Sequence, residues 1–197
     1  MKELFLSEGE LDERRKQLPE RLKQYLPDPP HFAASFTSLD QYTKVIGIHQ
    51  GVNRGPDYTS WRVSLAGKQI AIGYYEVWLY EKSRGMAVRY LLNKAYLHVF
   101  VPHSAGDEMP LVYLHCDPQE RESSEHYRYK VAPHAHFEIA GNPWSDIHVP
   151  LCDGRQDEVL SSLACLDQAI ERAVEFVVQQ LCPVTGKLDL AKAFRTR

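Results

Sequence analysis

The sequence has few cysteines and no strong excess of either charge. Its four cysteines are widely spaced over 197 residues and form no Cys-x-x-Cys pair, a pattern typical of reduced thiols in a cytoplasmic protein. The 23 Lys and Arg residues nearly balance the 26 Asp and Glu residues, leaving a net charge of −3. The broad positive field of a general duplex nucleic-acid-binding protein is therefore missing. The cysteines are Cys116, Cys152, Cys165 and Cys182.

Long hydrophobic runs and common catalytic motifs are also absent. No stretch approaches the roughly 18 apolar residues of a membrane span, so we expect no membrane insertion. Residues 1–7 contain one Lys and a short apolar stretch broken by Glu3, so we expect no secretory signal. The sequence has no P-loop, no dinucleotide fingerprint, no His-Glu-x-x-His and no Gly-x-Ser-x-Gly. These absences argue against the best-known nucleotide-binding, metalloprotease and serine hydrolase families.

The composition favours one α+β domain covering residues 1–197. Apolar residues make up 44% of the chain and charged residues 25%, as in ordinary globular proteins. The patterning predicts a helical arm over residues 1–30, a mostly antiparallel sheet of about six to eight strands over 44–151, and a basic tail over 187–197. A long C-terminal helix over 155–182 is expected to lie on one face of the sheet.

Both predicted helices carry recognisable local signals. Ser7 and Glu10 match the Ser-x-x-Glu capping box, which predicts a helix start. Pro19 should kink this helix or open a second one, and the arm could pack on the body or reach a partner. Near the C-terminus, apolar residues recur every three or four positions, which is the pattern of an amphipathic helix. They are Val159, Leu163, Leu166, Ile170, Ala173, Val174, Val177 and Leu181.

The sheet prediction depends on short runs rich in Val, Ile, Tyr, Trp and Phe. The connections between these runs are too short to contain crossover helices, which favours antiparallel pairing. The predicted strands cover residues 44–49, 60–65, 69–81, 86–91, 95–101, 111–116, 126–131 with 134–140, and 146–151.

Histidine is the unusual feature: five of the nine histidines fall between positions 115 and 148. Alternate residues of a strand share a face, so His134, His136 and Glu138 should lie on one face of their strand. The next run places Asp146 and His148 on one face in the same way. A hairpin closed around residue 142 would put His136 opposite His148, and Glu138 opposite Asp146.

This patch suggests two kinds of chemistry. His134, His136, His148 and Asp146 are suitable ligands for a divalent metal such as Zn, Mn or Fe. Alternatively, His134, His136 and His148, supported by Glu138, could act as general acid and base because histidine titrates near neutral pH. We expect catalytic roles for these four residues in either case.

A second group of residues predicts the charge of the substrate. Arg128 and Lys130 share one face of the run before the histidines, where they could bind a phosphate or carboxylate. Tyr127 lies beside them and could stack on a nucleotide base. The sequence thus favours a hydrolase-like protein that acts on a phosphorylated or nucleotide-like anionic substrate.

The string His134-Ala135-His136-Phe137-Glu138 resembles two short family patterns. One is the histidine triad of nucleotide hydrolases and transferases, in which a third alternating histidine stands where this chain has Glu138. The other is the His-x-His of cupin metal sites. The resemblance covers five residues, and the chain as a whole resembles no known family.

Three alternatives remain open from the sequence. A polar strand face that contacts solvent needs no function. The chain could instead be a non-catalytic adaptor, with a protein partner bound through the N-terminal helix and the tyrosine-rich edges, because tyrosine is favoured at interfaces and the chain has 11. It could also be a module that senses a small anion without turnover.

Overall fold

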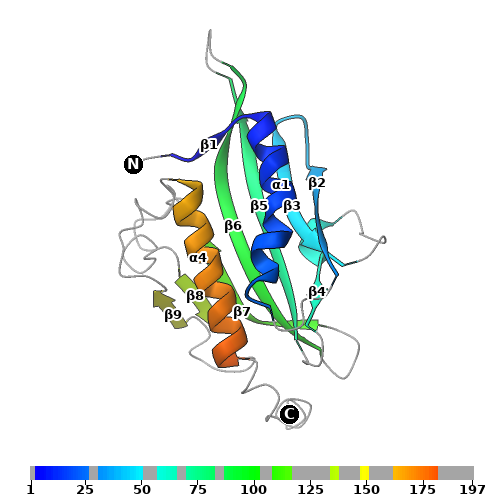
Figure 1. Cartoon of the computed structure of the whole chain (residues 1–197), viewed down its shortest axis with the longest axis vertical. Coiled ribbons are helices and arrows are strands. Elements are labelled where there is room, and N and C mark those ends of the chain that lie inside the picture. Colours follow the sequence, from blue (N-terminus) through cyan, green and yellow to red (C-terminus); the bar gives the residue numbers. More distant parts are fainter. Residues whose placement is uncertain are drawn as a thin grey trace.

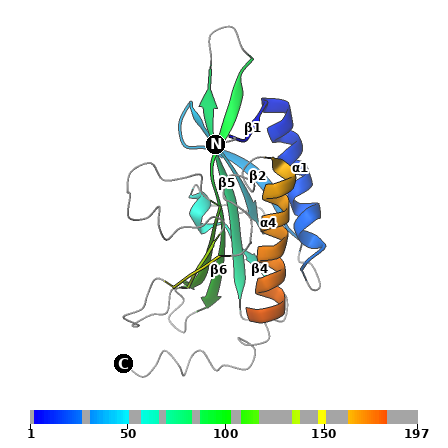
Figure 2. The same cartoon turned by 90° about the vertical axis from the view of Figure 1, so that its left-hand side faces the viewer.

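The computed structural model describes residues 3–26, 31–50, 57–65, 70–82, 87–102, 108–116, 134–137, 147–150 and 162–181, and the account below concerns these. An antiparallel sheet carries helices α1 and α4 on one of its faces (Figures 1 and 2). The predicted α+β class is confirmed, and so is the antiparallel arrangement of the sheet.

The strands follow the order β2-β3-β5-β6-β7-β8-β9, with β1 attached to β6 and β4 attached to β5. Each described pairing is antiparallel, as the short connections predicted. The bounds are β1 Phe5–Leu6, β2 Ala33–Ser38, β3 Thr43–His49, β4 Val63–Ser64, β5 Ala71–Glu81, β6 Arg89–Pro102, β7 Glu108–Cys116, β8 His134–Phe137 and β9 Ile147–Pro150.

Several parts of the sheet differ from the sequence prediction. Strand β1 was not predicted, and the run expected at 60–65 gives only the two-residue strand β4 after the 3₁₀ turn η1 (Tyr58–Ser60). The runs expected at 86–91 and 95–101 form one long strand, β6, because a register shift opposite Val77 and Trp78 absorbs the irregularity between them. Strand β2 was not predicted, because its sequence Ala-Ala-Ser-Phe-Thr-Ser has small and polar residues and a weak strand pattern. The run expected at 126–131 lies outside the described residues.

Helix α1 spans Glu8–Lys23 and begins with the expected capping box. The Ser7 hydroxyl accepts a hydrogen bond from the Glu10 N–H at 3.3 Å, and the Glu10 carboxylate accepts one from the Ser7 N–H at 2.7 Å. The Ser7 N–H and the Ser7 hydroxyl both donate to the Glu10 carboxylate, and these two bonds lower the pKa of Glu10. The helix continues through Pro19 and packs on the sheet, burying Leu11, Leu18 and Leu22.

Helix α4 spans Leu163–Phe176 and continues as a π-helical segment, η2, over Val177–Leu181. The predicted start near residue 155 is wrong. Ser162 has an extended backbone and caps the helix, since its hydroxyl accepts a hydrogen bond from the Cys165 N–H at 3.3 Å. The α-helix is therefore 14 residues long, or about 21 Å at 1.5 Å per residue. None of the described helices is long and apolar enough to span a membrane.

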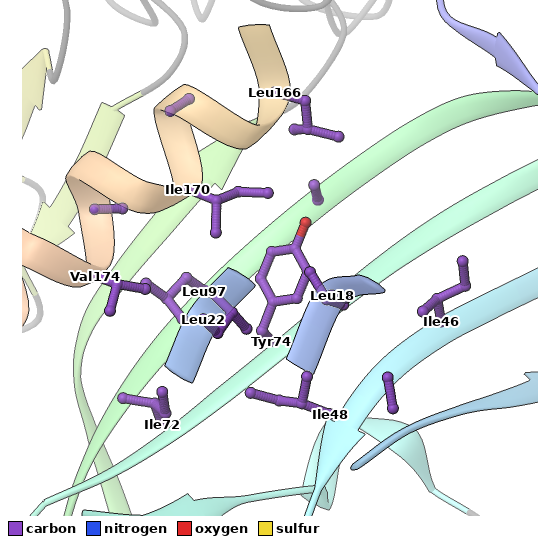
Figure 3. Close-up of a cluster of buried hydrophobic side chains, with 14 of the residues drawn as sticks. Leu18, Leu22, Ile46, Ile48, Ile72, Tyr74, Leu97, Leu166, Ile170 and Val174 are labelled. Carbon is purple, nitrogen blue, oxygen red and sulfur yellow. The ribbon is translucent and has the colours of Figure 1, made fainter. Parts of the chain in front are cut away.

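The main hydrophobic core lies between the two helices and the sheet (Figure 3). Leucines of α1 and aliphatic side chains of α4 meet alternate residues of β3, β5 and β6. Each of these side chains is at least 95% buried, so their packing fixes both helices against one face. The labelled members are Leu18, Leu22, Ile46, Ile48, Ile72, Tyr74, Leu97, Leu166, Ile170 and Val174.

Candidate functional site

A buried ionic network lies under the helices and ties them to the sheet. Arg14 of α1 donates two hydrogen bonds to one oxygen of Glu76 on β5, at 3.0 and 2.7 Å. Its other terminal nitrogen contacts Asp167 of α4. The exposed fractions of Arg14, Glu76 and Asp167 are 3%, 0% and 6%. The two carboxylates raise the pKa of the Arg14 guanidinium, so it stays charged.

Neighbouring groups complete the partners of both buried carboxylates. The Tyr74 hydroxyl and the Trp78 indole N–H donate to Glu76 at 2.6 and 3.0 Å. Arg21 lies 3.1 Å from Asp167 and 3.4 Å from Glu171. Because these buried charges are paired and hydrogen-bonded to one another, the network has a structural role in positioning α1 and α4.

We call the face opposite the helices the open face. Successive residues of β6 lie on opposite faces of the sheet. Leu97 and Val99 belong to the helix-covered core, so Tyr96 and His98 lie on the open face. Tyr75 of β5 pairs with Tyr96, and the two rings are 5.5 Å apart between centroids. Tyr75 also belongs to a small second core with Val45 and Val77.

His98 is the described histidine with the most distinctive surroundings. Its ring lies 5.5 Å from Tyr75, 5.7 Å from Tyr96 and 5.9 Å from Phe100, measured between centroids. Burial, together with the positive charge of Arg62, lowers the pKa of His98 to about 4. The imidazole is thus neutral at pH 7, and it offers an acceptor and a donor rather than a charge.

A short segment, residues 57–62, crosses part of the open face, and we call it the strap. It contains the 3₁₀ turn η1 (Tyr58–Ser60), capped by Asp57, and lies on the side of the sheet away from the helices (Figure 2). Its Trp61 ring packs on Gly47: a Cβ atom there would lie 2.7 Å from the ring. A Cβ at Gly73 would lie 2.9 Å from the Trp61 carbonyl oxygen. The absence of side chains at Gly47 and Gly73 therefore lets the strap pack closely on the open face of the sheet.

The strap also brings a cation to the open face. The Arg62 guanidinium lies 3.3 Å from the centroid of the Phe100 ring and donates to the Trp61 carbonyl at 2.9 Å. Lys94 is a second cation on this face, with its Nζ atom 5.4 Å from the centroid of the Tyr96 ring. This part of the open face thus combines aromatic rings, one neutral imidazole and two cations.

Backbone register continues the His98 position across the sheet. His98 pairs with Tyr113 of β7, Tyr113 pairs with His136 of β8, and His136 pairs with His148 of β9. Directly paired residues of antiparallel strands lie on the same side of the pleat. These positions therefore form one cross-strand row, about 14 Å long at the usual strand spacing. The hairpin register expected from the sequence, with His136 opposite His148, is the one observed.

A second row of positions lies next to the first. Tyr96 pairs with His115 of β7, and His115 pairs with His134 of β8. The alternate position on β6 is Leu97, which is buried in the helix-covered core; it pairs with Leu114, and Leu114 pairs with Ala135. The backbone thus places five histidine positions in two adjacent rows of the open face: 98, 136 and 148 in one, 115 and 134 in the other.

The other predicted site residues lie outside the described part of the chain. These are Glu138, Asp146, Tyr127, Arg128 and Lys130. Within the described residues, no group of three or more His, Cys, Asp or Glu is arranged to hold a metal ion. The metal ligands expected from the sequence therefore remain a prediction.

The sequence analysis did not include Lys94, Tyr96 and His98 in the site. Their alternation with Ala95, Leu97 and Val99 is the signal that would have found them, because it places ionisable and aromatic residues on one face. What it does not reveal is which distant strands lie beside β6.

The fold and the open face define an α+β protein whose sheet is covered by helices on one side and carries histidine and aromatic positions on the other. No family model matches the chain, and no curated protein or solved structure matches it either. Any assignment of function therefore depends on the residues themselves.

Proposed function

We propose that the chain is a hydrolase-like protein that acts on a phosphorylated or nucleotide-like anionic substrate at the open face, between β6 and β9. The observation that supports this most strongly is the cross-strand register, which puts His98, His136 and His148 in one row and His115 and His134 in the next. Neighbouring imidazoles of this kind can serve as a general acid and a general base at neutral pH.

In this proposal His136 and His148 carry the chemistry. Paired positions of an antiparallel sheet have Cβ atoms about 4.5–5.5 Å apart, so both imidazoles reach one substrate group. One removes a proton from the attacking water, and the other protonates the leaving oxygen. His134 and Glu138 support them. In the metal-dependent version, His134, His136, His148 and Asp146 would hold a divalent Zn, Mn or Fe ion, and such an ion would supply Lewis-acid chemistry.

The cations expected near the two histidine rows favour a negatively charged substrate. Arg128 and Lys130 would hold the anionic group and Tyr127 would contact an attached base. Lys94 supports the same conclusion from the described part of the chain, because it brings an ammonium group to the open face beside Tyr96. His98 adds a neutral imidazole, whose ring lies 5.7 Å from the Tyr96 ring between centroids.

The test compares three histidine variants with bis(4-nitrophenyl) phosphate and 4-nitrophenyl phosphate as probes. We expect the wild-type chain to hydrolyse at least one probe, and His136→Asn and His148→Asn to lose about 100-fold or more of that rate. His31→Asn is the matched control, since His31 is exposed and lies outside the two rows. Hydrolysis of neither probe, or full activity in both variants, would refute the proposal.

Elemental analysis of the same preparations separates the two versions. Near-stoichiometric Zn, Mn or Fe that is lost in a His134→Ala, His136→Ala double variant supports the metal-dependent site. Activity without bound metal, unchanged by a chelator, supports the acid–base version.

One observation favours a second candidate, a protein-binding adaptor. Leu39, Tyr42 and Val88 are large apolar side chains with exposed fractions of 55%, 56% and 37%. Tyr42 contacts Tyr80, and Tyr80 contacts Tyr90, so a tyrosine-rich patch forms where the β2–β3 turn meets β5 and β6. Affinity capture with the wild-type chain and a Leu39→Glu, Tyr42→Glu variant tests this: the same proteins captured by both would rule out the patch.

A further inference from the structure

A serine and a histidine are hydrogen-bonded at the edge of the open face, away from the two histidine rows. The Ser35 hydroxyl oxygen of β2 lies 2.7 Å from the Nε2 atom of His49 on β3. In the β2–β3 register Ser35 pairs with Gly47 and His49 pairs with Ala33, so the two residues are diagonal neighbours on one side of the pleat. A hydroxyl within hydrogen-bond reach of an imidazole is the geometry of a nucleophile and its base.

This pair lies at one edge of the described sheet. The residue opposite His49 is an exposed alanine, whereas the glycine opposite Ser35, Gly47, is covered by the Trp61 ring. Strand β2 is also the first strand in the described order of the sheet, and both Ser35 and His49 are partly exposed. A small substrate can therefore approach the Ser35 oxygen from the sheet edge.

The strap fixes the orientation of the imidazole. The His49 ring packs edge-on against Trp61, with 5.4 Å between centroids and an interplanar angle of 70°. Trp61 itself is 4% exposed and is held over Gly47 and Gly73. A base whose ring is held by a third group loses less conformational freedom when it takes up a proton, which favours proton transfer from the hydroxyl.

We propose that Ser35 and His49 form a nucleophile–base pair that accepts an acyl or phosphonyl group from esters and fluorides with good leaving groups. The Ser35 oxygen attacks the carbonyl carbon or the phosphorus while its proton passes to Nε2 of His49. A new bond forms from the Ser35 oxygen, and the bond to the leaving group breaks. The His49 proton then passes to the leaving group, or to solvent when that group is fluoride. Water completes the cycle by hydrolysing the acyl-serine.

The experiment measures covalent labelling with an alkyl fluorophosphonate by intact-protein mass spectrometry, with peptide mapping of the labelled residue. We expect one phosphonyl group on Ser35 in the wild-type chain, none in Ser35→Ala, and labelling about 100-fold slower in His49→Gln, because a general base typically contributes a factor of 10² to 10⁴. Ser38→Ala is the matched control: it lies on the same strand, exposed, at a position of opposite parity. Ser38→Ala should be labelled at the wild-type rate.

Two results would overturn the proposal. One is a wild-type chain that is not labelled at Ser35, which would make the 2.7 Å contact a structural hydrogen bond alone. The other is labelling of Ser35 at the same rate in wild type and His49→Gln, which would remove the base from the mechanism. Circular dichroism of each variant shows whether it is folded, and the wild-type result decides the question even if a variant is not. A second probe, 4-nitrophenyl acetate, should give a burst of nitrophenolate in wild type that Ser35→Ala lacks.

Discussion

The two faces of the sheet are made from alternate residues of the same strands, yet they contain different kinds of interaction. The covered face packs aliphatic side chains against α1 and α4, and its charged groups are held in one closed network around Glu76. The open face has glycines under the strap, the rings of Tyr58 and Tyr75 in edge contact, and the His98 imidazole near the Arg62 guanidinium. One residue along β5 separates Tyr75 of the open face from Glu76 of the covered face.

The chain places its main hydrophobic core and its row of histidine positions on opposite faces of one sheet. The covered face supplies most of the buried apolar area, and such area is the main favourable term in folding. The open face can then carry polar residues that contribute little to stability. Substitutions on the covered face should accordingly change the free energy of unfolding most, and those on the open face should change pH dependence and reactivity.

The largest effect is expected from removing the central cation of the covered face. Arg14→Met leaves Glu76 and Asp167 buried without their main partner, and breaking a buried pair in this way costs about 3–5 kcal/mol. Urea unfolding followed by circular dichroism measures the change. Arg15→Met is the control on the same helix, because Arg15 pairs with Asp12 at the surface and should cost at most about 1 kcal/mol. Equal losses in the two variants would contradict the structural role of the network.

A somewhat smaller effect is expected on the open face, from the titration of His98. Its folded-state pKa of about 4 lies below the ordinary value of 6.5, so between these pH values the unfolded chain binds a proton that the folded chain does not. Stability should therefore fall by about 3 kcal/mol as the pH drops from 6.5 to 4. His98→Phe keeps an aromatic ring among Tyr75, Tyr96 and Phe100 and should remove this part of the pH dependence. Unfolding curves of both proteins across the pH range test it; parallel curves would refute the assignment.

The smallest effect is expected where the strap contacts the sheet. Gly47→Ala places a Cβ atom 2.7 Å from the buried Trp61 ring, and such overpacking costs about 1–3 kcal/mol. Gly9→Ala is the matched control, since a Cβ at Gly9 meets no atom within 4 Å and alanine favours the helix by up to about 1 kcal/mol. In thermal unfolding, the Tm of Gly47→Ala should fall below that of wild type and the Tm of Gly9→Ala should rise above it. A Gly47→Ala protein as stable as wild type would show that the strap can shift away from the added Cβ atom at little cost in free energy.

Local patterns predicted much of the fold. The two-residue period of residues 134–139 and 146–151 was enough to give the observed pairing of His136 with His148, because a shift by one residue would expose the apolar side chains. The capping box at Ser7 and Glu10 located the start of α1 to the residue. The start of the C-terminal α-helix was harder to place, since the apolar period from Val159 to Leu181 gives no sign of the extended backbone at Ser162.

The interactions that hold distant segments together could not be predicted from one sequence. Arg14 is 62 residues from Glu76 and 153 residues from Asp167 in the sequence. The local sequence around each of these three residues does not distinguish it from an ordinary surface charge. The Ser35–His49 contact depends on the register of β2 against β3, and the sequence of β2 has only a weak strand pattern. The place of His98 beside the predicted histidines likewise depends on the order of strands β6 to β9.

The position of Asp167 in the chain has a consequence for biosynthesis. The ribosome makes Arg14 and Glu76 early, and α4 is the last described element to emerge. Until then the covered face lacks Leu166, Ile170 and Val174, and an incomplete chain exposes the apolar residues that they cover. Exposed surface of this kind is what chaperones recognise and what drives aggregation of nascent chains. Chains interrupted before residue 162 should therefore be removed by the cell's quality control.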